Sequence, residues 1–405
     1  MKETMKKVQI FGLALGIALF VACSSDDSSG TGGPVDPAFF DGTTLRGAVT
    51  KDFTIPAGSY ILKGDVTVED GITLVIEAGT TFTASNSDGI DVFIVKQGGT
   101  VIADGTANQP IVFTADVQEK GQWGGITIAG RAPVNFGIGE GEAFQQVSPA
   151  IAEVRNLPYG GNMPDDNSGM LNYVRVEYGG AQLTPESEFN AFTFYGVGSG
   201  TTLSNLQAYY GKDDGFEFFG GTVNATNLVA TACGDDSLDW TEGWTGSVSN
   251  IYITMESDAD SGFEGDGNGL NNNAMPASNP QLSNITIIGA DGVGEGINLR
   301  EGTNVAIDNV YISGFDGAAG DQKYIEIDSQ NTTTYISEGS FILTHIDFND
   351  PAAGFKIDFD TEPEDVLFDG FLADLGLPGF TENEEATGAG NGADLPEWAT
   401  EWTVQ

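Results

Sequence analysis

Acidic side chains recur at regular places in the middle third of the sequence. A short phrase of acids and apolar residues occupies 213–217, 235–239 and 260–264, and a fourth copy at 294–298 ends in Asn. Clustered carboxylates suit Ca²⁺, which takes roughly six to eight oxygen ligands and tolerates irregular geometry. The carboxylates that we predict as calcium ligands are Asp213, Asp214, Glu217, Asp235, Asp236, Asp239, Asp260, Glu264 and Asp266.

A second phrase, Asn followed by a branched apolar residue, recurs between the acidic ones at steps of 22, 23, 34 and 25 residues. Such a period indicates one unit stacked on copies of itself, and short β-branched runs broken by Gly, Asn and Asp make that unit a coil of strands. We therefore predict an all-β fold, a right-handed parallel β-helix, with a ladder of side-chain amides joining the coils at one corner. The predicted ladder contains Asn205, Asn227, Asn250, Asn284 and Asn309.

Strand alternation places the acids of each phrase on the outside, because successive side chains point to opposite faces. Stacked coils would align Glu217, Asp239 and Glu264 in one column at a spacing of about 4.8 Å. Two carboxylates at that spacing repel by about 3 kcal/mol at an effective dielectric near 20. Raised pKa values, solvent screening or a bound cation would relieve the repulsion, and a solvated acidic face is the simpler interpretation.

Charge and composition exclude several kinds of partner. The formal net charge is −44, from 15 Lys and Arg against 59 Asp and Glu. Such a chain is repelled by nucleic acid and by anionic membrane surfaces. One His and two Cys are too few for an ordinary zinc site. We therefore predict no nucleic-acid partner, and neither zinc nor a nucleotide as cofactor.

The N-terminus has the features of a bacterial lipoprotein signal. A basic start precedes the apolar segment 10–21, which is too short to span a membrane, so residues 1–22 are predicted to be a signal peptide. Phe20-Val21-Ala22-Cys23 resembles a lipobox, although the family prefers Leu in the place of Phe20. The resemblance implies cleavage before Cys23 and lipid on its side chain. Residues 23–27 also resemble the Ser/Asp-rich start of Bacteroidetes-type lipoproteins, which implies a chain anchored in the outer membrane and facing the cell exterior.

Interruptions of the repeat predict where the chain leaves the coils. A long loop is expected at 131–169, and shorter excursions at 181–189 and 267–280, which would wall a groove if they gather on one side. The predicted parts of the chain are a signal peptide at 1–22, a tether and N-terminal cap at 23–44, the β-helix at 45–350, and a C-terminal cap with an acidic tail at 351–405.

Catalysis is one alternative that the acidic residues raise. Paired carboxylates can cleave a glycosidic bond, and Gly234-Asp235-Asp236 resembles a short motif of polygalacturonases. That family also uses Asn-Thr-Asp, Gly-His-Gly and Arg-Ile-Lys, and none of these occurs here. Lyases of the same fold pair Ca²⁺ with a basic residue, and those in or near the acidic phrases are Arg175, Lys212 and Arg300. A polysaccharide lyase or glycoside hydrolase acting along the acidic columns therefore stays open.

Residues 213–224 and 234–244 together resemble a widespread group of bacterial surface lipoproteins with β-helix repeats. The resemblance implies the fold and the location, and it implies no activity, because the group has none that is settled. We expect a non-catalytic binding or structural protein in which Ca²⁺ stiffens the stack or bridges to a glycan ligand. Besides the enzyme, an accessory lipoprotein of an outer-membrane transporter or secretion complex is an alternative. The expected partners are the outer membrane, through the lipid anchor, and a glycan or an outer-membrane protein.

Overall fold

The computed structural model describes most of the chain from residue 38 onward. The residues described are 38–137, 150–152, 154–185, 187–290, 293–315, 323–328, 335, 338–349, 357–360, 366–368 and 379–405. The predicted signal peptide, the lipidation site Cys23 and the predicted tether before residue 38 lie outside them. Within the described ranges, no helix is long and apolar enough to cross a membrane.

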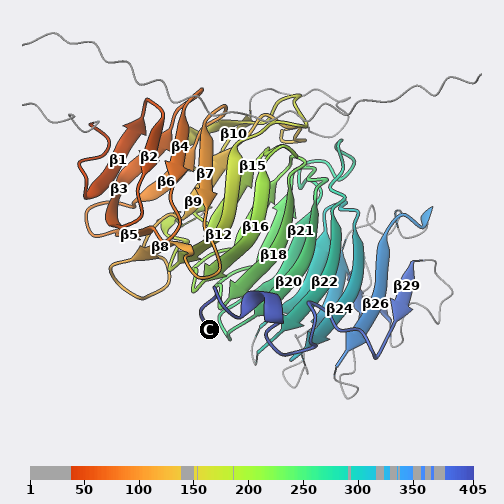
Figure 1. Ribbon diagram of the computed structural model, residues 1–405. Helices are drawn as coiled ribbons and strands as arrows, with labels where there is room; N and C mark the ends of the chain where they lie inside the picture. The colour runs from red at the N-terminus through yellow and green to blue at the C-terminus, as the bar shows by residue number, and fades with distance from the viewer. Residues whose placement is uncertain are drawn as a thin grey trace, which may run out of the picture. The chain divides into compact units, whose positions relative to one another are not determined.

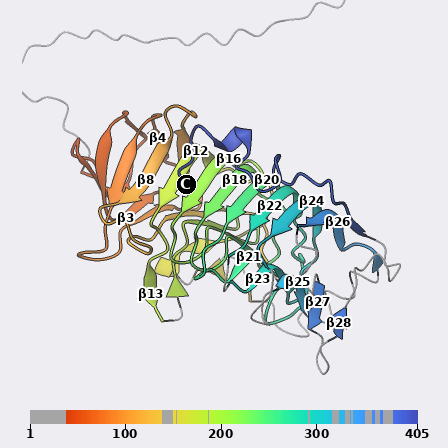
Figure 2. The ribbon, with the colours of Figure 1, turned by 90° about the horizontal axis from the view of Figure 1, so that it is seen from below.

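Parallel strands stacked coil on coil form the body of the fold (Figures 1 and 2). The strands are short and rich in β-branched and aromatic residues, with Gly, Asn and Asp between them. Strands pair with the equivalent strands of the neighbouring coils, so the chain winds through three sheets, here named sheets 1, 2 and 3. The prediction of an all-β parallel β-helix is confirmed.

Sheet 1 carries the acidic phrases. Its strands are β3 (Ser59–Val68), β6 (Val92–Val95), β9 (Ile126–Ala129), β15 (Phe192–Tyr195), β17 (Phe216–Phe219), β19 (Leu238–Thr241), β21 (Ser261–Asp266), β23 (Glu295–Arg300), β25 (Lys323–Asp328) and β27 (Ile357–Asp360). The short strand β28 (Val366–Phe368) pairs with β27 in the antiparallel sense.

Sheets 2 and 3 begin as separate strands and continue as long strands that bend from one sheet into the other. Sheet 2 starts with β2 (Phe53–Ile55), β4 (Thr73–Ile76) and β7 (Thr100–Asp104), and sheet 3 with β1 (Thr44–Val49), the first residues of β3, β5 (Thr81–Ala84) and β8 (Ile111–Ala115). The strands shared by both sheets are β12 (Gly169–Glu177), β16 (Thr202–Tyr209), β18 (Asn224–Thr231), β20 (Ser247–Thr254), β22 (Gln281–Ile288), β24 (Ala306–Ser313) and β26 (Ile342–Phe348), followed by β29 (Phe380–Glu382).

Smaller elements lie outside the coils. Two antiparallel hairpins are formed by β10 (Ala150–Ile151) with β11 (Pro158–Tyr159), and by β13 (Gln182–Thr184) with β14 (Ser187–Glu188). Among the described residues there are also two single-turn 3₁₀ helices, η1 (Val154–Asn156) and η3 (Glu397–Ala399).

The core is a continuous stack of apolar side chains inside the coils. Phe216, Leu238, Phe263 and Ile297 are in register on successive strands of sheet 1, and each is at most 1% exposed. Aromatic rings also stack from coil to coil, with Phe192 and Phe216 centroids 5.0 Å apart. The alternation read from the sequence therefore gives the correct inward set.

The bend between sheets 2 and 3 is made by one residue with positive φ in each coil. Five Asn residues take this place, and each side-chain Nδ2 donates to an Asn Oδ1 one coil earlier at 2.8–3.0 Å; they are Asn205, Asn227, Asn250, Asn284 and Asn309. Asn tolerates the left-handed conformation better than most residues, which explains why it recurs. The ladder starts from Asn172, while Tyr173 and His345 adopt the positive φ at the two ends.

Residues 383–405, here named the C-terminal strap, run back along the outside of sheet 3 (Figure 1). The strap crosses an outward column in which Gln207, Val229, Tyr252 and Thr286 are in register. Gln207 Nε2 donates to Val404 O at 2.7 Å, and Tyr252 OH donates to Ala393 O at 2.9 Å. The sequence predicts a C-terminal cap with an acidic tail at 351–405, and the strap within this range is packed against the coils.

Candidate cation site

The acidic column is present on the outward side of sheet 1. Glu217 on β17 is in register with Asp239 on β19, and Asp239 with Glu264 on β21. Asn298 on β23 continues the column. Side chains alternate along each strand, and the residues before and after each acid are buried. Each acid therefore points to the outer face of the sheet.

Protein covers the column, and this differs from a solvated acidic face. Asn190, which follows the β13–β14 hairpin, is 4% exposed and donates a hydrogen bond to the Glu217 carboxylate. The Glu264 side chain is 13% exposed, and one carboxyl oxygen of Asp239 has no contact with solvent. The carboxylates therefore stand where solvent screens little of their repulsion.

Two predicted loop excursions meet on the outer face of sheet 1. Asn135, from the excursion at 131–169, is fully buried and donates to Pro276 O at 2.9 Å. Asn268, from the excursion at 267–280, donates in return to Asn135 O at 2.8 Å. The third excursion forms the β13–β14 hairpin (Figure 2) that leads into Asn190. Where the structure describes them, these excursions cover the sheet with packed protein.

A second tier of carboxylates lies where the chain enters sheet 1. Asp214 and Asp236 hold equivalent places in successive coils and are 6% and 4% exposed. Asp214 Oδ1 accepts the backbone N–H of Asp236 at 3.0 Å, and Asp236 Oδ1 accepts that of Ser261 at 2.8 Å. Each carboxylate thus binds a backbone donor of the next coil, which fixes its position.

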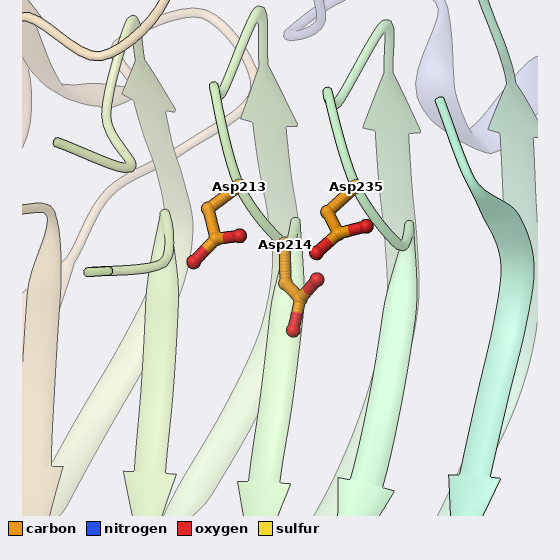
Figure 3. A group of neighbouring side chains, drawn as sticks. All are labelled: Asp213, Asp214 and Asp235. Carbon is orange, nitrogen blue, oxygen red and sulfur yellow. The ribbon is translucent and has the colours of Figure 1, made fainter. Parts of the chain in front are cut away.

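Carboxyl oxygens of the two tiers approach within 4.8 Å of one another in three groups. Figure 3 shows the first, in which Asp213 and Asp214 come from one coil and Asp235 from the next. Seven of the nine carboxylates predicted as ligands are in these groups, and we name them the acidic cluster. The groups are Asp213, Asp214 and Asp235; Asp214, Glu217 and Asp239; and Asp235, Asp236 and Asp260.

The other two predicted ligands, Glu264 and Asp266, form ion pairs with Arg300 on β23. Arg300 Nε lies 2.8 Å from Asp266 Oδ1, and its Nη2 donates to the Glu264 carboxylate. The Glu264 and Asp266 side chains are 13% and 14% exposed, whereas that of Arg300 is 36% exposed, so it is the two carboxylates that are largely shielded from water. The guanidinium of Arg300 therefore supplies the counter-charge for Glu264 and Asp266. Neither acid belongs to the three carboxylate groups.

Burial and like charge raise the pKa values of the cluster. Burial raises the pKa of Asp213 to about 8, with Asp235 and Glu188 adding repulsion, and Asp213 is hydrogen-bonded to Asp235. Burial, followed by neighbouring carboxylates, raises the pKa values of Glu217 and Asp239, the column acids that belong to the cluster, well above their ordinary range. The same two causes raise the pKa values of Asp214 and Asp236 in the second tier. At neutral pH the cluster must therefore hold protons or bind cations.

Two buried oxygens at the cluster lack any hydrogen-bond partner among the described residues: Asp239 Oδ1 and Ser261 Oγ. Ser261 is 0% exposed, and its backbone N–H binds Asp236. Buried polar atoms almost always have a partner in native proteins, so an exception asks for an explanation. A cation beside these oxygens would give both a partner.

The sequence profile of the pectate-lyase-like beta helix domain matches residues 47–403. The chain belongs to this family. The match includes the acidic cluster and nearly all of the C-terminal strap. A comparison with curated proteins finds no match, and neither does a comparison with solved structures.

Within this pectate-lyase-like β-helix, the three candidate basic residues have different surroundings. Arg300 contacts the acids of β21 directly. Lys212 Nζ donates to Gln182 Oε1 at 3.1 Å, and Arg175 Nε pairs with Glu177 at 2.5 Å on sheet 3. Arg300 is thus the basic residue that the fold brings into contact with the predicted ligands.

Two residues of the covered face, Asn190 and Tyr159, were not predicted from the sequence. Asn190 holds the place of Asp214 one coil earlier, and the likeness of Asn190-Ala-Phe-Thr193 to Asp214-Gly-Phe-Glu217 was the available signal. Glu242, just after β19, accepts a hydrogen bond from Tyr159 OH at 2.7 Å, and burial raises its pKa to about 7. No repeat pattern marks Tyr159, because it lies in the excursion at 131–169.

Proposed function

We propose that the protein is a non-catalytic β-helix that binds Ca²⁺ in the acidic cluster and serves as a binding or structural surface outside the cell. The observation that carries the proposal is the approach of carboxyl oxygens to within 4.8 Å in three groups. Ca²⁺ fits because it takes roughly six to eight oxygens in irregular geometry. It would also neutralise carboxylates that burial otherwise forces to keep their protons.

Thermal unfolding of the purified protein in EDTA and in millimolar Ca²⁺ tests cation binding. A ligand that binds only the folded state adds about 2.7 kcal/mol at about 100 times its Kd, so we expect the Tm to rise by several degrees. The Glu217→Gln, Asp239→Asn double variant should lose this rise. Glu264→Gln is the control, because its carboxylate faces Arg300, and it should keep the rise. An unchanged Tm in the wild type would refute calcium binding.

We propose that the chain is anchored by lipid on Cys23 and exposed on the outer membrane. The support is the lipobox-like sequence at 20–23 and the Ser/Asp-rich residues that follow. Metabolic labelling with palmitate should mark the wild type and spare a Cys23→Ser variant. Proteolysis of intact cells then tests whether the protein faces the cell exterior. Protection from the protease would place it on the inner face of the outer membrane.

A glycan is the ligand class that we propose for the outer surface. A groove of about 270 Å³ on sheet 2 has four neutral polar residues in its lining, Ser247, Ser249, Gln281 and Ser283, together with apolar residues and Asp308. Such neutral donors and acceptors match sugar hydroxyls better than the acidic remainder of the surface does. A glycan array in Ca²⁺ tests this, with a Ser249→Tyr, Ser283→Tyr variant to block the groove. Binding that survives the block would place the glycan elsewhere.

A polysaccharide lyase or hydrolase is the second candidate. Glu217 and Asp239 are carboxyls with raised pKa values, and a carboxyl that keeps its proton can act as a general acid. Incubation with neutral and acidic polysaccharides, followed by assay of reducing ends and unsaturated products, separates the two functions. Product from the wild type and none from Glu217→Gln would favour the enzyme. For the accessory-lipoprotein alternative, the test is copurification with an outer-membrane protein.

A further inference from the structure

We propose that the acidic cluster binds at least two divalent cations as one linked unit, bridged by Asp214 and Asp235 and ended by Arg300. This inference rests on the proposed calcium binding, and it assigns how many ions bind and which side chains connect them. The three groups overlap: Asp214 belongs to the first and second, and Asp235 to the first and third. An ion in one group therefore shares a ligand with an ion in the next.

The charge of the cluster is larger than one divalent ion can offset. Seven carboxylates lie in overlapping groups, and one divalent cation offsets only two of their charges. Asp214 and Asp236 are almost fully buried, so solvent does little to screen the remainder. Each of these two also uses one oxygen for a backbone N–H and keeps its second oxygen for another partner.

The unpartnered buried oxygens mark two separate places in the cluster. Asp239, which carries the first of these oxygens, Oδ1, belongs to the second group with Asp214 and Glu217. Ser261 Oγ lies beside the third group, because the Ser261 N–H binds the Oδ1 of Asp236. Ser261 is 0% exposed, so bulk water cannot supply a hydrogen-bond partner for its hydroxyl. One unpartnered oxygen at each end of the cluster fits two ions better than one.

Arg300 acts as a resident cation at the coil where the cluster stops. The column continues in register from Asp239 to Glu264, yet Glu264 belongs to none of the three groups. The guanidinium binds Glu264 and Asp266 there, and its charge also acts on Asp239. Because an Arg side chain stays charged at any ordinary pH, it repels a metal ion from this position.

Calorimetric titration and native mass spectrometry of the purified protein with Ca²⁺ count the ions. The wild type should bind two or more. Asp214→Asn keeps an oxygen for the Asp236 N–H, yet it should weaken two ions at least tenfold, because it removes the shared charge. Asp260→Asn touches the third group alone and should affect one ion, and Glu264→Gln should leave the count unchanged. Arg300→Gln should add one ion.

The outcomes separate this inference from calcium binding itself. A single bound ion in the wild type would overturn the linked unit and leave the proposed function standing, whereas no bound ion removes both. An unchanged count in Arg300→Gln would overturn the role assigned to Arg300. The wild-type count needs no variant, so it decides the main point even if a substitution prevents folding.

Discussion

The outward face of sheet 1 is covered along two neighbouring stretches with opposite chemistry. Its first coils present Val92, Ile94, Ala129 and Tyr195, which form an apolar cluster with loop residues such as Tyr159. The next coils present the acidic cluster, with Asn190 bound to Glu217 and the loop around Asn135 packed just after β19 and β21.

One column passes through both stretches, because Ile94, Thr127, Thr193 and Glu217 are in register on β6, β9, β15 and β17. Excluding water stabilises the apolar stretch, since burial of apolar surface is favourable. The same exclusion raises the cost of each carboxylate in the acidic stretch. The cover therefore stabilises the fold where the face is apolar, and it encloses carboxylates where the face is acidic.

The largest expected effect comes from moving an acid into the apolar stretch. Ile94 is 3% exposed, so Ile94→Asp would bury a charge without a partner and lower the free energy of unfolding by about 3–5 kcal/mol. Chemical denaturation measures this, with Ile94→Leu as the control, which should cost less than about 1.5 kcal/mol. Ca²⁺ should not restore Ile94→Asp. A tolerated Asp would show that the two stretches are covered alike.

Acid should stabilise the metal-free protein. The folded-state pKa of Asp213 is about 8 and that of Glu242 about 7, both raised by burial above their ordinary values. Between the ordinary values and these, the folded state binds more protons than the unfolded state, so stability falls as pH rises through this window. Each group that titrates fully contributes about 1.4 kcal/mol per pH unit at most.

Melting temperatures in EDTA at a series of pH values between about 5 and 8 measure this slope. Glu242→Gln should flatten it, because the amide does not titrate, and Ca²⁺ should flatten it further by replacing protons in the cluster. A Tm in EDTA that increases with pH across the window would contradict the burial of these acids.

Removing one charge from the acidic stretch should help the metal-free protein. In EDTA at about pH 8, Asp239→Asn removes repulsion with Glu217 and Glu264 and should raise the free energy of unfolding by about 1–2 kcal/mol. Asp258→Asn is the comparison, since its side chain is 58% exposed and pairs with Lys120, and it should change stability by less than about 1 kcal/mol. A loss of stability in Asp239→Asn would mean that repulsion is not what limits this stretch.

The smallest change in stability is expected at Thr127 and Thr193, which lie in the column between the apolar and the acidic stretch. Thr127 Oγ1 is buried without a partner among the described residues, so Thr127→Val should raise the free energy of unfolding by about 0.5–1 kcal/mol. Thr193 is its neighbour in the column, and its hydroxyl accepts a hydrogen bond from Asn190 at 3.4 Å. Thr193→Val should therefore lower stability slightly in the same urea titration. Equal changes in the free energy of unfolding for Thr127→Val and Thr193→Val would contradict a difference between the two stretches at this border.

The sequence predicts the parts of this structure that repeat. The steps between the Asn residues and the alternation around Phe216 predict the coils, the amide ladder and the alignment of Glu217 with Asp239. These features repeat because each coil contacts only its neighbours, so the same local rule applies many times.

The cover of the acids follows no such rule. Asn190 reaches Glu217 across 27 residues, Tyr159 reaches Glu242 across 83, and Asn135 reaches Pro276 across 141. These contacts depend on how the excursions pack in space, and their sequences have no period. The ion pair of Arg300 with Glu264 could not be predicted for a related reason, because it depends on the register between β21 and β23.

The C-terminal strap also sets an order of events during synthesis. Gln207 and Val404 are 197 residues apart in the sequence, yet each binds the other. Coils can assemble one after another as the chain emerges, but Val229 and Tyr252 stay uncovered until residues 383–405 have been made. A chain that stops before residue 383 would keep an apolar strip along sheet 3, which faster cleavage in limited proteolysis would reveal. The strap thus makes the finished protein distinguishable from a shortened one by its surface alone.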